Sequence, residues 1–341
     1  MVDLSKKIRF AWSVLRRKIV HVNLQLLYTC NFKCRICDFW KEPYSEMPSL
    51  SVEQVKVITE KLARIGPQVI SIGGGEPLLH KNLLEIVRIL SKNNFPVMIC
   101  NGWFMTPELA KALFQAGMYE VSISIDYASP AKHDEQRGMK GAFVRAVEAL
   151  RMLQENRVYP HQRVHLISVV MEDNIDEIDS LIKLSRELGV TYLVTLYSDN
   201  RGRKHGMHSN SDISSRLLEL KAKYPEFVAL RGYIGRFSEA INNGGIDPCY
   251  AGKNLINIGT TGNVSFCIDN LEASAGNILT DDIRVIQKNL IQQRGKIACK
   301  GCWTSCRGSI ETLMYGKNKL KSFLDYYEMT KDVAVEGGYC K

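Results

Sequence analysis

The sequence lacks the long apolar segments and the export signal that would direct the chain into or across a membrane. No run of about 18 apolar residues occurs among its 341 residues, so the sequence predicts no membrane-spanning helix. Its N-terminus lacks the basic, apolar and small-residue pattern of a cleaved signal peptide. Ten cysteines without such a signal indicate a reducing compartment, where thiols serve metals or catalysis rather than disulfides. We therefore expect a cytoplasmic protein.

Evenly spread positive charge is also lacking, although the formal net charge is +9. Residues 1–20 contain six basic residues and one acidic residue, which amounts to +5, and the rest of the chain adds only +4. No nucleic-acid-binding motif accompanies this segment. Because the basic character is local, we expect no nucleic-acid partner.

The basic segment 1–20 predicts an amphipathic helix over residues 4–19. Leu4, Ile8, Leu15 and Ile19 recur at helical intervals, with Trp12 among them and basic side chains around them. Such a helix can lie on an anionic membrane surface, which would associate the protein peripherally with a membrane through residues 1–20. The alternative is that the apolar stripe packs on the body of the protein. We favour packing, because one short helix is a weak anchor.

A fourth ligand is missing from a loop in which three cysteines have the spacing C-x3-C-x2-C. These are Cys30, Cys34 and Cys37, and the next cysteine along the chain is Cys100. A structural zinc site or an ordinary cubane iron–sulfur cluster takes four protein ligands. His21 is not a candidate, because it falls in a predicted strand. A [4Fe–4S] cluster on these three thiolates would leave one iron open to an exogenous ligand.

Strands and helices alternate regularly through the first two thirds of the chain, which predicts an α/β fold with parallel βαβ units. The predicted strands cover residues 21–28, 68–72, 96–100, 119–126, 163–170 and 191–196. The second of them runs into Ser71-Ile72-Gly73-Gly74-Gly75-Glu76-Pro77. A triple glycine by itself is usually a tight strand-to-helix turn.

Together, the cysteine loop, the strand before it and the glycine-rich turn resemble the radical SAM superfamily, whose enzymes cleave S-adenosylmethionine (SAM) reductively. The resemblance covers residues 20 to 200 and implies a partial (β/α)6 TIM-like barrel. It implies that Cys30, Cys34 and Cys37 are catalytic and hold a [4Fe–4S] cluster whose open iron is chelated by SAM. Ile36 departs from the aromatic residue that the family often has before the last cysteine.

Further positions match the family's cofactor-binding motifs. The resemblance implies that the glycine turn approaches the SAM amino group and that an arginine in the stretch His133-Asp134-x-x-Arg137-Gly138 binds the SAM carboxylate. At the end of the fourth predicted strand, alternation points Ser122, Ser124 and Asp126 to one face, where we expect hydroxyl and carboxylate groups to bind the ribose. The residues concerned are Gly73, Gly74, Gly75, Glu76, Asn101, Ser122, Ser124, Asp126 and Arg137. For Arg137 a surface salt bridge is an equal alternative. Arg201-Gly202-Arg203 resembles a further turn of the family, and Cys100 is interpreted as a small buried residue.

A second set of cysteines follows a polar bridging segment, residues 201–248. Cys249 and Cys267 bracket a predicted hairpin with Gly262 in its turn, and the set ends in Cys299-x2-Cys302-x3-Cys306. The pattern resembles the C-terminal auxiliary-cluster extensions called SPASM and twitch domains, so residues 249–341 are expected to form a small α+β domain. We expect one auxiliary [4Fe–4S] cluster on Cys249, Cys267 and two of Cys299, Cys302 and Cys306. By spacing alone a zinc site is equally compatible. Cys340 is a free thiol or a reach-over ligand.

The resemblance implies hydrogen abstraction by a 5′-deoxyadenosyl radical, with an external electron donor such as flavodoxin or ferredoxin. The auxiliary cluster would support net oxidation or bond formation on a small molecule or natural-product intermediate. Only about 20 residues precede the first strand, which argues against leader-peptide recognition in cis. Peptide or protein modification and lipid modification are the alternatives within the family. A zinc-binding nucleic-acid regulator is the alternative from another class.

Overall fold

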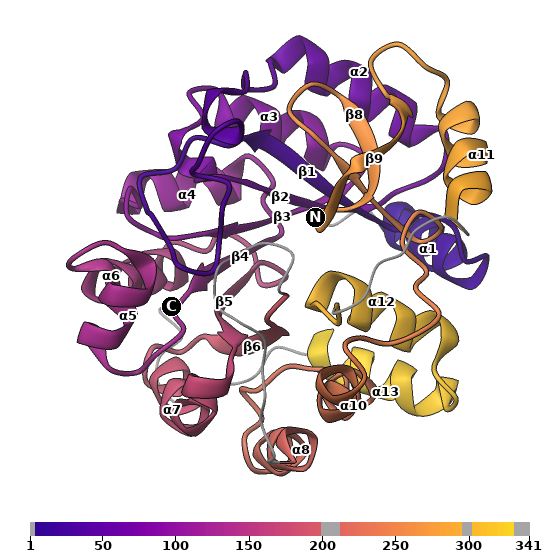
Figure 1. Ribbon diagram of the computed structural model, residues 1–341. Helices are drawn as coiled ribbons and strands as arrows, with labels where there is room; N and C mark the ends of the chain where they lie inside the picture. The colour runs from indigo at the N-terminus through magenta and orange to yellow at the C-terminus, as the bar shows by residue number, and fades with distance from the viewer. Residues whose placement is uncertain (1–3, 199–211, 295–301, 331–341) are drawn as a thin grey trace.

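The computed structural model describes residues 4–198, 212–294 and 302–330, and within them the strands join into one nine-stranded sheet (Figure 1). The strand order is β6-β5-β4-β3-β2-β1-β7-β8-β9. The strands are β1 (His21–Leu27), β2 (Val69–Gly74), β3 (Phe95–Cys100), β4 (Glu120–Ser124), β5 (Arg163–Val170), β6 (Thr191–Leu196), β7 (Leu255–Ile258), β8 (Asn263–Cys267) and β9 (Asn270–Asn277).

The first six strands pair in parallel in sequence order, and helices cover their outer face (Figure 1). This arrangement confirms the expected α/β fold with its TIM-like parallel core. The outer helices are α2 (Val52–Ala63), α3 (Leu83–Ser91), α4 (Pro107–Gln115), α5 (Pro130–Arg137), α6 (Ala142–Glu155) and α7 (Ile178–Glu187), with short 3-10 helices η1 (Tyr44–Glu46), η2 (Pro77–Leu79) and η3 (Glu172–Glu177).

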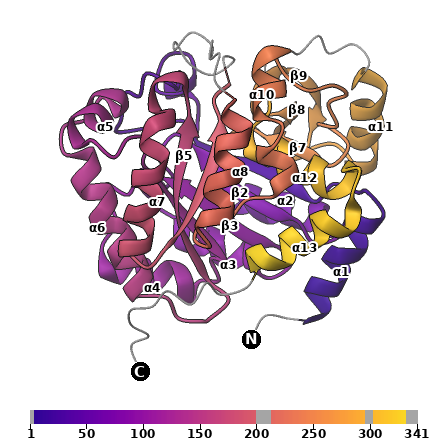
Figure 2. The same ribbon diagram turned by 90° about the horizontal axis from the view of Figure 1, so that it is seen from below.

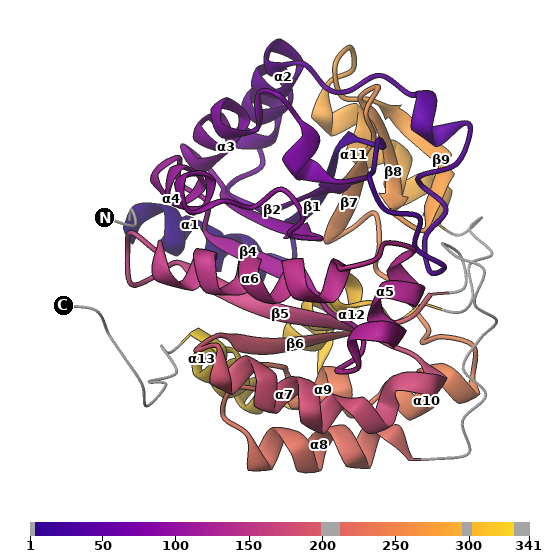
Figure 3. The same ribbon diagram turned by 90° about the vertical axis from the view of Figure 1, so that its left-hand side faces the viewer.

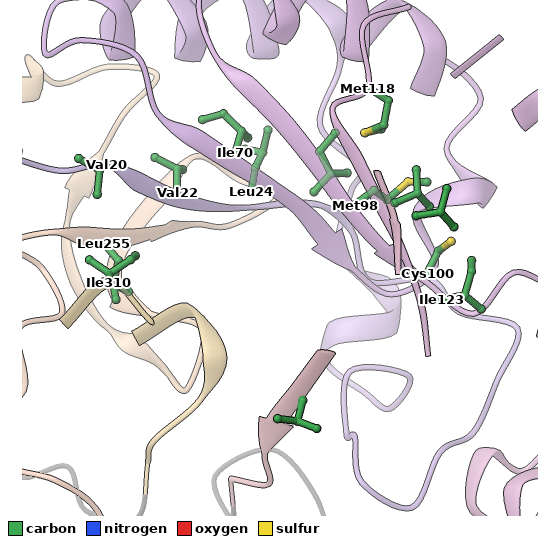
Figure 4. Close-up of a cluster of buried hydrophobic side chains, with 14 of the residues drawn as sticks. Val20, Val22, Leu24, Ile70, Met98, Cys100, Met118, Ile123, Leu255 and Ile310 are labelled. Carbon is green, nitrogen blue, oxygen red and sulfur yellow. The ribbon is translucent and has the colours of Figure 1, made fainter. Parts of the chain in front are cut away.

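Apolar strand residues and the inner faces of these helices form the core. Figure 4 shows Leu24, Ile70, Met98 and Cys100 gathered between them, and Cys100 is 4% exposed, as expected of a small buried residue. Helix α2 begins where the sequence predicts. The Ser51 hydroxyl accepts a hydrogen bond from the backbone N–H of Gln54, whose side chain accepts one from the Ser51 N–H.

The C-terminal part of the chain extends the core sheet. Strand β7 pairs in parallel with β1, and β8 and β9 continue as antiparallel partners, so the predicted hairpin is present. The start of α12 reaches both sides of the open barrel: Ser305 N–H donates to Thr195 on β6, and Cys306 contacts Asn23 on β1. The remaining helices are α8 (Ile213–Lys223), α9 (Arg231–Ile234), α10 (Phe237–Asn242), α11 (Ile283–Gln293), α12 (Ser305–Tyr315) and α13 (Lys319–Thr330).

Helix α1 (Leu4–Leu15) corrects one expectation. The favoured packing of its Leu4-Ile8-Leu15 stripe on the body is wrong, because these three side chains are 69%, 52% and 74% exposed. The helix instead packs through Phe10 and Ser13, on its opposite face. In Figures 2 and 3, α1 lies at the end of the sheet opposite the loop that follows β1. In the described part of the chain, no helix is both long and apolar enough to cross a bilayer.

Candidate functional site

The three cysteines of the C-x3-C-x2-C loop line one cavity at the carboxyl end of the parallel strands. Its empty space is about 1360 Å³, including the part open to solvent. Burial raises the pKa of the Cys30 thiol to about 12, although the backbone N–H of Phe32 donates to its sulfur at 3.4 Å. Of the other predicted residues, this first cavity is lined by Gly73, Gly74, Gly75, Glu76, Asn101, Ser124 and Arg137.

The three glycines at the end of β2 have different roles. A Cβ on Gly74 would lie 2.0 Å from the backbone oxygen of Leu27, and one on Gly75 would lie 2.1 Å from that of Thr29. These two glycines let the turn lie against the backbone that leads into the cysteine loop, where Gly75 N–H donates to Leu27 at 2.7 Å. A Cβ on Gly73 would meet only the Gln25 side chain, at 3.9 Å. Gly73 is therefore the one that keeps cavity space open.

Glu76 joins the glycine turn to the next strand. One carboxylate oxygen accepts from the backbone N–H of Leu78 at 3.0 Å and the other from that of Asn101 at 2.8 Å. Burial raises the pKa of this carboxyl to about 7, although the two hydrogen bonds lower it. The Asn101 amide in turn donates to the side chain of Asn31 in the cysteine loop, at 2.9 Å. Glu76 thus positions Asn101, and Asn101 ties β3 to the loop.

Arg137 and Asp126 form a buried ion pair beside the loop. Their side chains are 10% and 0% exposed and their charged atoms lie 2.7 Å apart, so the surface salt bridge considered for Arg137 is wrong. Arg137 also interacts with Cys34: burial raises the pKa of that thiol and Arg137 opposes the shift. Asp126 further accepts from the backbone N–H of Val169 at 3.0 Å.

The expected row of Ser122, Ser124 and Asp126 is corrected in part. Strand β4 ends at Ser124, and of the three only Ser124 belongs to the described lining of the first cavity. Ser122 is 3% exposed and lies one step deeper in the sheet, where it pairs in register with His165. Asp126 lies past the strand, where Arg137 and Val169 hold its carboxylate. The alternation of side chains along the strand does not reach Asp126, because β4 stops at Ser124.

The stretch from His133 to Gly138 forms helix α5 and contacts the cysteine loop. Gly138 adopts φ 63°, and a Cβ there would lie 2.7 Å from the backbone oxygen of Lys33. The ring nitrogen Nδ1 of His133 accepts from Asp126 N–H at 3.1 Å. Asp134 accepts from the backbone at the start of α6, from Phe143 at 2.9 Å. These residues build the wall that carries Arg137.

Two buried amides in the first cavity escaped the sequence analysis. Asn23 and Gln25 are 5% and 1% exposed, and Gln25 Oε1 and Asn23 Nδ2 have no hydrogen-bond partner. The amide nitrogen of Gln25 donates to Asn257 on β7 at 2.8 Å. The signal was a polar residue at every second position of an otherwise apolar interior strand, since inward-facing amides there need a reason.

The second cysteine set lines a cavity of about 800 Å³ between the hairpin and α12. Its described lining includes Cys249, Cys267, Cys302 and Cys306. Cys299 lies outside the described residues, as do Arg201, Gly202, Arg203 and Cys340. Asn23 and Ile268 line both cavities. The two cavities therefore share a wall.

A buried arginine lies beside these thiols. Arg307 donates to the backbone oxygen of Cys302 at 2.8 Å and to Glu311 at 2.9 Å. Burial lowers the pKa of Arg307, but Cys249, Glu311 and Cys302 outweigh that effect and raise it. Burial raises the pKa of the Cys302 thiol to about 12, and the positive charge of Arg307 opposes that rise.

The thiols surround spaces instead of meeting at a point. Among residues 4–198, 212–294 and 302–330, no three Cys, His, Asp or Glu side chains gather closely enough to bind a single metal ion. In a cubane each thiolate binds a different iron, so its ligands stand around a volume. The arrangement at both cavities is compatible with clusters of that kind.

Comparisons with known proteins match this geometry. Residues 24–185 match the family model of the Radical SAM superfamily. This part of the chain belongs to the Radical SAM superfamily. The chain is 31% identical to an AdoMet-dependent heme synthase of Methanosarcina barkeri, over 48% of this chain and 46% of that protein. It is 28% identical to the mycofactocin maturase MftC of Mycolicibacterium smegmatis, over 83% of this chain and 76% of that one.

The fold of this radical SAM enzyme is also found in SuiB of Streptococcus suis bound to its precursor peptide SuiA. That structure superposes with a TM-score of 0.60 at 14% identity and covers 82% of this chain and 68% of SuiB. SuiB has likewise been crystallised with S-adenosylmethionine. The family implies SAM binding and a [4Fe–4S] cluster, and the first cavity fits them. Its lining brings the three thiols, the glycines of the turn and Arg137 around one space.

Proposed function

We propose that Cys30, Cys34 and Cys37 hold the [4Fe–4S] cluster and that the first cavity beside them binds SAM. When bound, the cluster supplies the electron that splits SAM into methionine and a 5′-deoxyadenosyl radical, which removes hydrogen from an unactivated carbon. Three thiolates leave one iron without a protein ligand, and that vacancy suits a chelating amino acid. The observation that carries the proposal is the convergence of the three thiols and the glycine turn on one cavity.

The residues around the cavity would orient SAM. Gly73 leaves room for its amino group, Arg137 supplies positive charge for its carboxylate, and the Ser124 hydroxyl is available to its ribose. Asp126 holds the guanidinium of Arg137 in place, and Glu76 holds Asn101. Buried apolar strand residues below exclude water, which protects a radical from quenching.

We also propose an auxiliary [4Fe–4S] cluster in the second cavity, held by Cys249, Cys267, Cys302 and Cys306, with Cys299 as the other candidate. Such a cluster supplies an electron acceptor or a substrate ligand, which makes the net change an oxidation or a bond formation. Its support is that four cysteines from three separate segments line one space next to Arg307. Because Asn23 and Ile268 line both cavities, a substrate bound in the first cavity would lie next to the second.

The proposed substrate is a natural-product intermediate, small or peptide-derived. The similarity to a maturase over most of the chain favours the peptide-derived class. Gln25 and Asn23 line the cavity, and the unsatisfied Gln25 Oε1 and Asn23 Nδ2 favour a substrate with hydroxyl or amide groups. An external one-electron donor such as flavodoxin or ferredoxin would serve the first cluster.

Anaerobic purification and reconstitution test these proposals. A brown protein with about eight irons per chain supports two cubanes, and about four irons support the first cluster alone. Colourless protein that contains zinc and no iron would instead support the zinc-binding regulator and overturn both cluster proposals.

A further inference from the structure

Helix α1 has two opposed faces, and its inner face anchors it. The Phe10 ring packs edge-on against Phe95, with ring centroids 5.4 Å apart. The ammonium group of Lys6 donates to the backbone oxygens of Ser91 and Asn94, at 2.9 and 3.0 Å, where α3 ends. Ser13 on the same face is buried. The helix is thus held in one orientation about its axis.

The outer face of α1 presents apolar side chains to solvent. Leu4, Ile8, Trp12 and Leu15 recur at helical spacing and are 69%, 52%, 55% and 74% exposed. At 3.6 residues per turn, Lys7 lies on one side of this stripe and Arg9 and Arg16 lie on the other. Residues 4–18 contain no acidic residue. An apolar stripe with cations on both sides is typical of helices that lie in a lipid interface.

Helix α13 carries a second stripe of the same kind. Leu320, Phe323 and Leu324 are 70%, 63% and 50% exposed and lie on one face. The opposite face is docked, since Asp325 is 3% exposed and accepts from the backbone N–H of Arg231 at 2.8 Å. Helix α13 is therefore held against the protein with its apolar stripe facing solvent.

Both stripes belong to the same end of the molecule. Phe95, which packs on α1, also contacts Tyr119, with ring centroids 5.4 Å apart. On the α13 side, Tyr326 is 39% exposed; its partial burial raises the pKa of its phenol, and the neighbouring Tyr119 and Glu120 raise that pKa further. Tyr119 and Glu120 lie at the start of β4, at the amino end of the parallel strands. Figures 2 and 3 place α1 and α13 at this end, away from the cysteine loop.

We propose that this end of the barrel docks on an anionic membrane surface through the α1 and α13 stripes. The cations beside the α1 stripe favour acidic lipid headgroups over a second copy of the chain, which would bring the same positive charge to the contact. Docking in this way turns the first cavity toward solution. A substrate would therefore enter the first cavity from the aqueous side.

Co-sedimentation of the full chain with vesicles tests the proposal. The wild-type protein should sediment with phosphatidylcholine–phosphatidylglycerol vesicles, far less with phosphatidylcholine alone, and less as salt is raised. The variant Leu4→Gln/Ile8→Gln/Trp12→Gln should bind at least about tenfold more weakly, since three apolar side chains no longer enter the interface. The variant Leu320→Gln/Phe323→Gln/Leu324→Gln should also weaken binding.

The matched control is Ile291→Gln on α11, whose side chain is 68% exposed near the end of the helix where Arg294 donates to the backbone oxygen of Cys249 beside the second cavity. It should bind as the wild type does. Equal binding by wild type and both stripe variants, or no binding to acidic vesicles, would overturn the proposal. So would a dimer in light scattering that only the stripe variants dissociate. SAM cleavage without membranes should be unchanged in all variants, which separates this outcome from failure of the proposed catalysis.

Discussion

The guanidinium of Arg137 lies 2.7 Å from the carboxylate of Asp126, and both groups are buried beside the loop that carries Cys34. This pair links the fourth strand to helix α5 and holds a positive charge at the edge of the first cavity. Removal of Asp126 would leave the largely buried Arg137 guanidinium without its carboxylate partner.

Asp126→Ala should therefore destabilise the fold by about 3 to 5 kcal/mol, because Arg137 would remain buried and unpaired. Denaturant unfolding measures the change. The matched control is Asp176→Ala, which removes the partner of Arg216 in an ion pair whose side chains are 91% and 42% exposed. The control should cost no more than about 1 kcal/mol. Equal losses of unfolding free energy in the two variants would mean that the buried pair contributes no more to stability than the exposed pair.

The glycine turn offers a comparison between neighbours. Gly75→Ala should destabilise the protein by about 1 to 3 kcal/mol or more, because its Cβ would lie 2.1 Å from a backbone oxygen that cannot move aside. Gly73→Ala should unfold like the wild type, since its Cβ would point into the cavity. Gly73→Ala should still weaken SAM binding, measured by equilibrium dialysis. Normal stability of Gly75→Ala would contradict the close approach of turn and loop.

His133 should make stability depend on pH. Burial, aided by Arg137, lowers its pKa from 6.5 to about 2. Below pH 6.5 the unfolded chain binds a proton that the folded chain does not, so stability is lost as pH falls, by about 1.4 kcal/mol per unit for this group.

The comparison variant is His133→Asn, whose amide oxygen can still accept from Asp126 N–H. Urea unfolding of both proteins between pH 7 and pH 5 should show a smaller loss in the variant. Parallel stability curves would show that His133 titrates in the folded protein as it does in the unfolded chain.

The auxiliary cluster makes a prediction of its own. Cys267→Ala should lower the iron content from about eight to about four per chain and still permit SAM cleavage, because the first cluster is untouched. Product formation should be lost. Cys100→Ala is the control, since that buried thiol borders the first cavity without belonging to either proposed ligand set, and the variant should keep all of its iron. Full iron in Cys267→Ala would show that this residue is not a ligand.

The parallel core could be predicted because its strands are buried on both faces and therefore stand out as apolar runs between helical periods. The cysteine loop and the glycine turn could be linked because the carboxyl ends of neighbouring parallel strands meet at one edge. The partner of Arg137 could not be predicted. A carboxylate past the end of β4 and an arginine on α5 come together only through tertiary packing.

Helix α1 shows a different limit. Its sequence contains two stripes, Phe10 with Ser13 and Leu4 with Ile8, and a helical period identifies stripes without saying which one the body covers. The reason for Gly74 and Gly75 was likewise hidden, because the backbone of Leu27 and Thr29 approaches them from a distant segment. Asn23 and Gln25, by contrast, stand out in the sequence as polar residues at alternate positions of an apolar strand.

The most direct test is anaerobic SAM cleavage by the reconstituted protein under dithionite, with methionine and 5′-deoxyadenosine quantified. The wild type and Cys100→Ala should form both products, and Cys34→Ala should form neither. Iron-loaded wild type that leaves SAM intact, or Cys34→Ala that cleaves SAM as well as the wild type, would contradict the assignment of the three-cysteine loop.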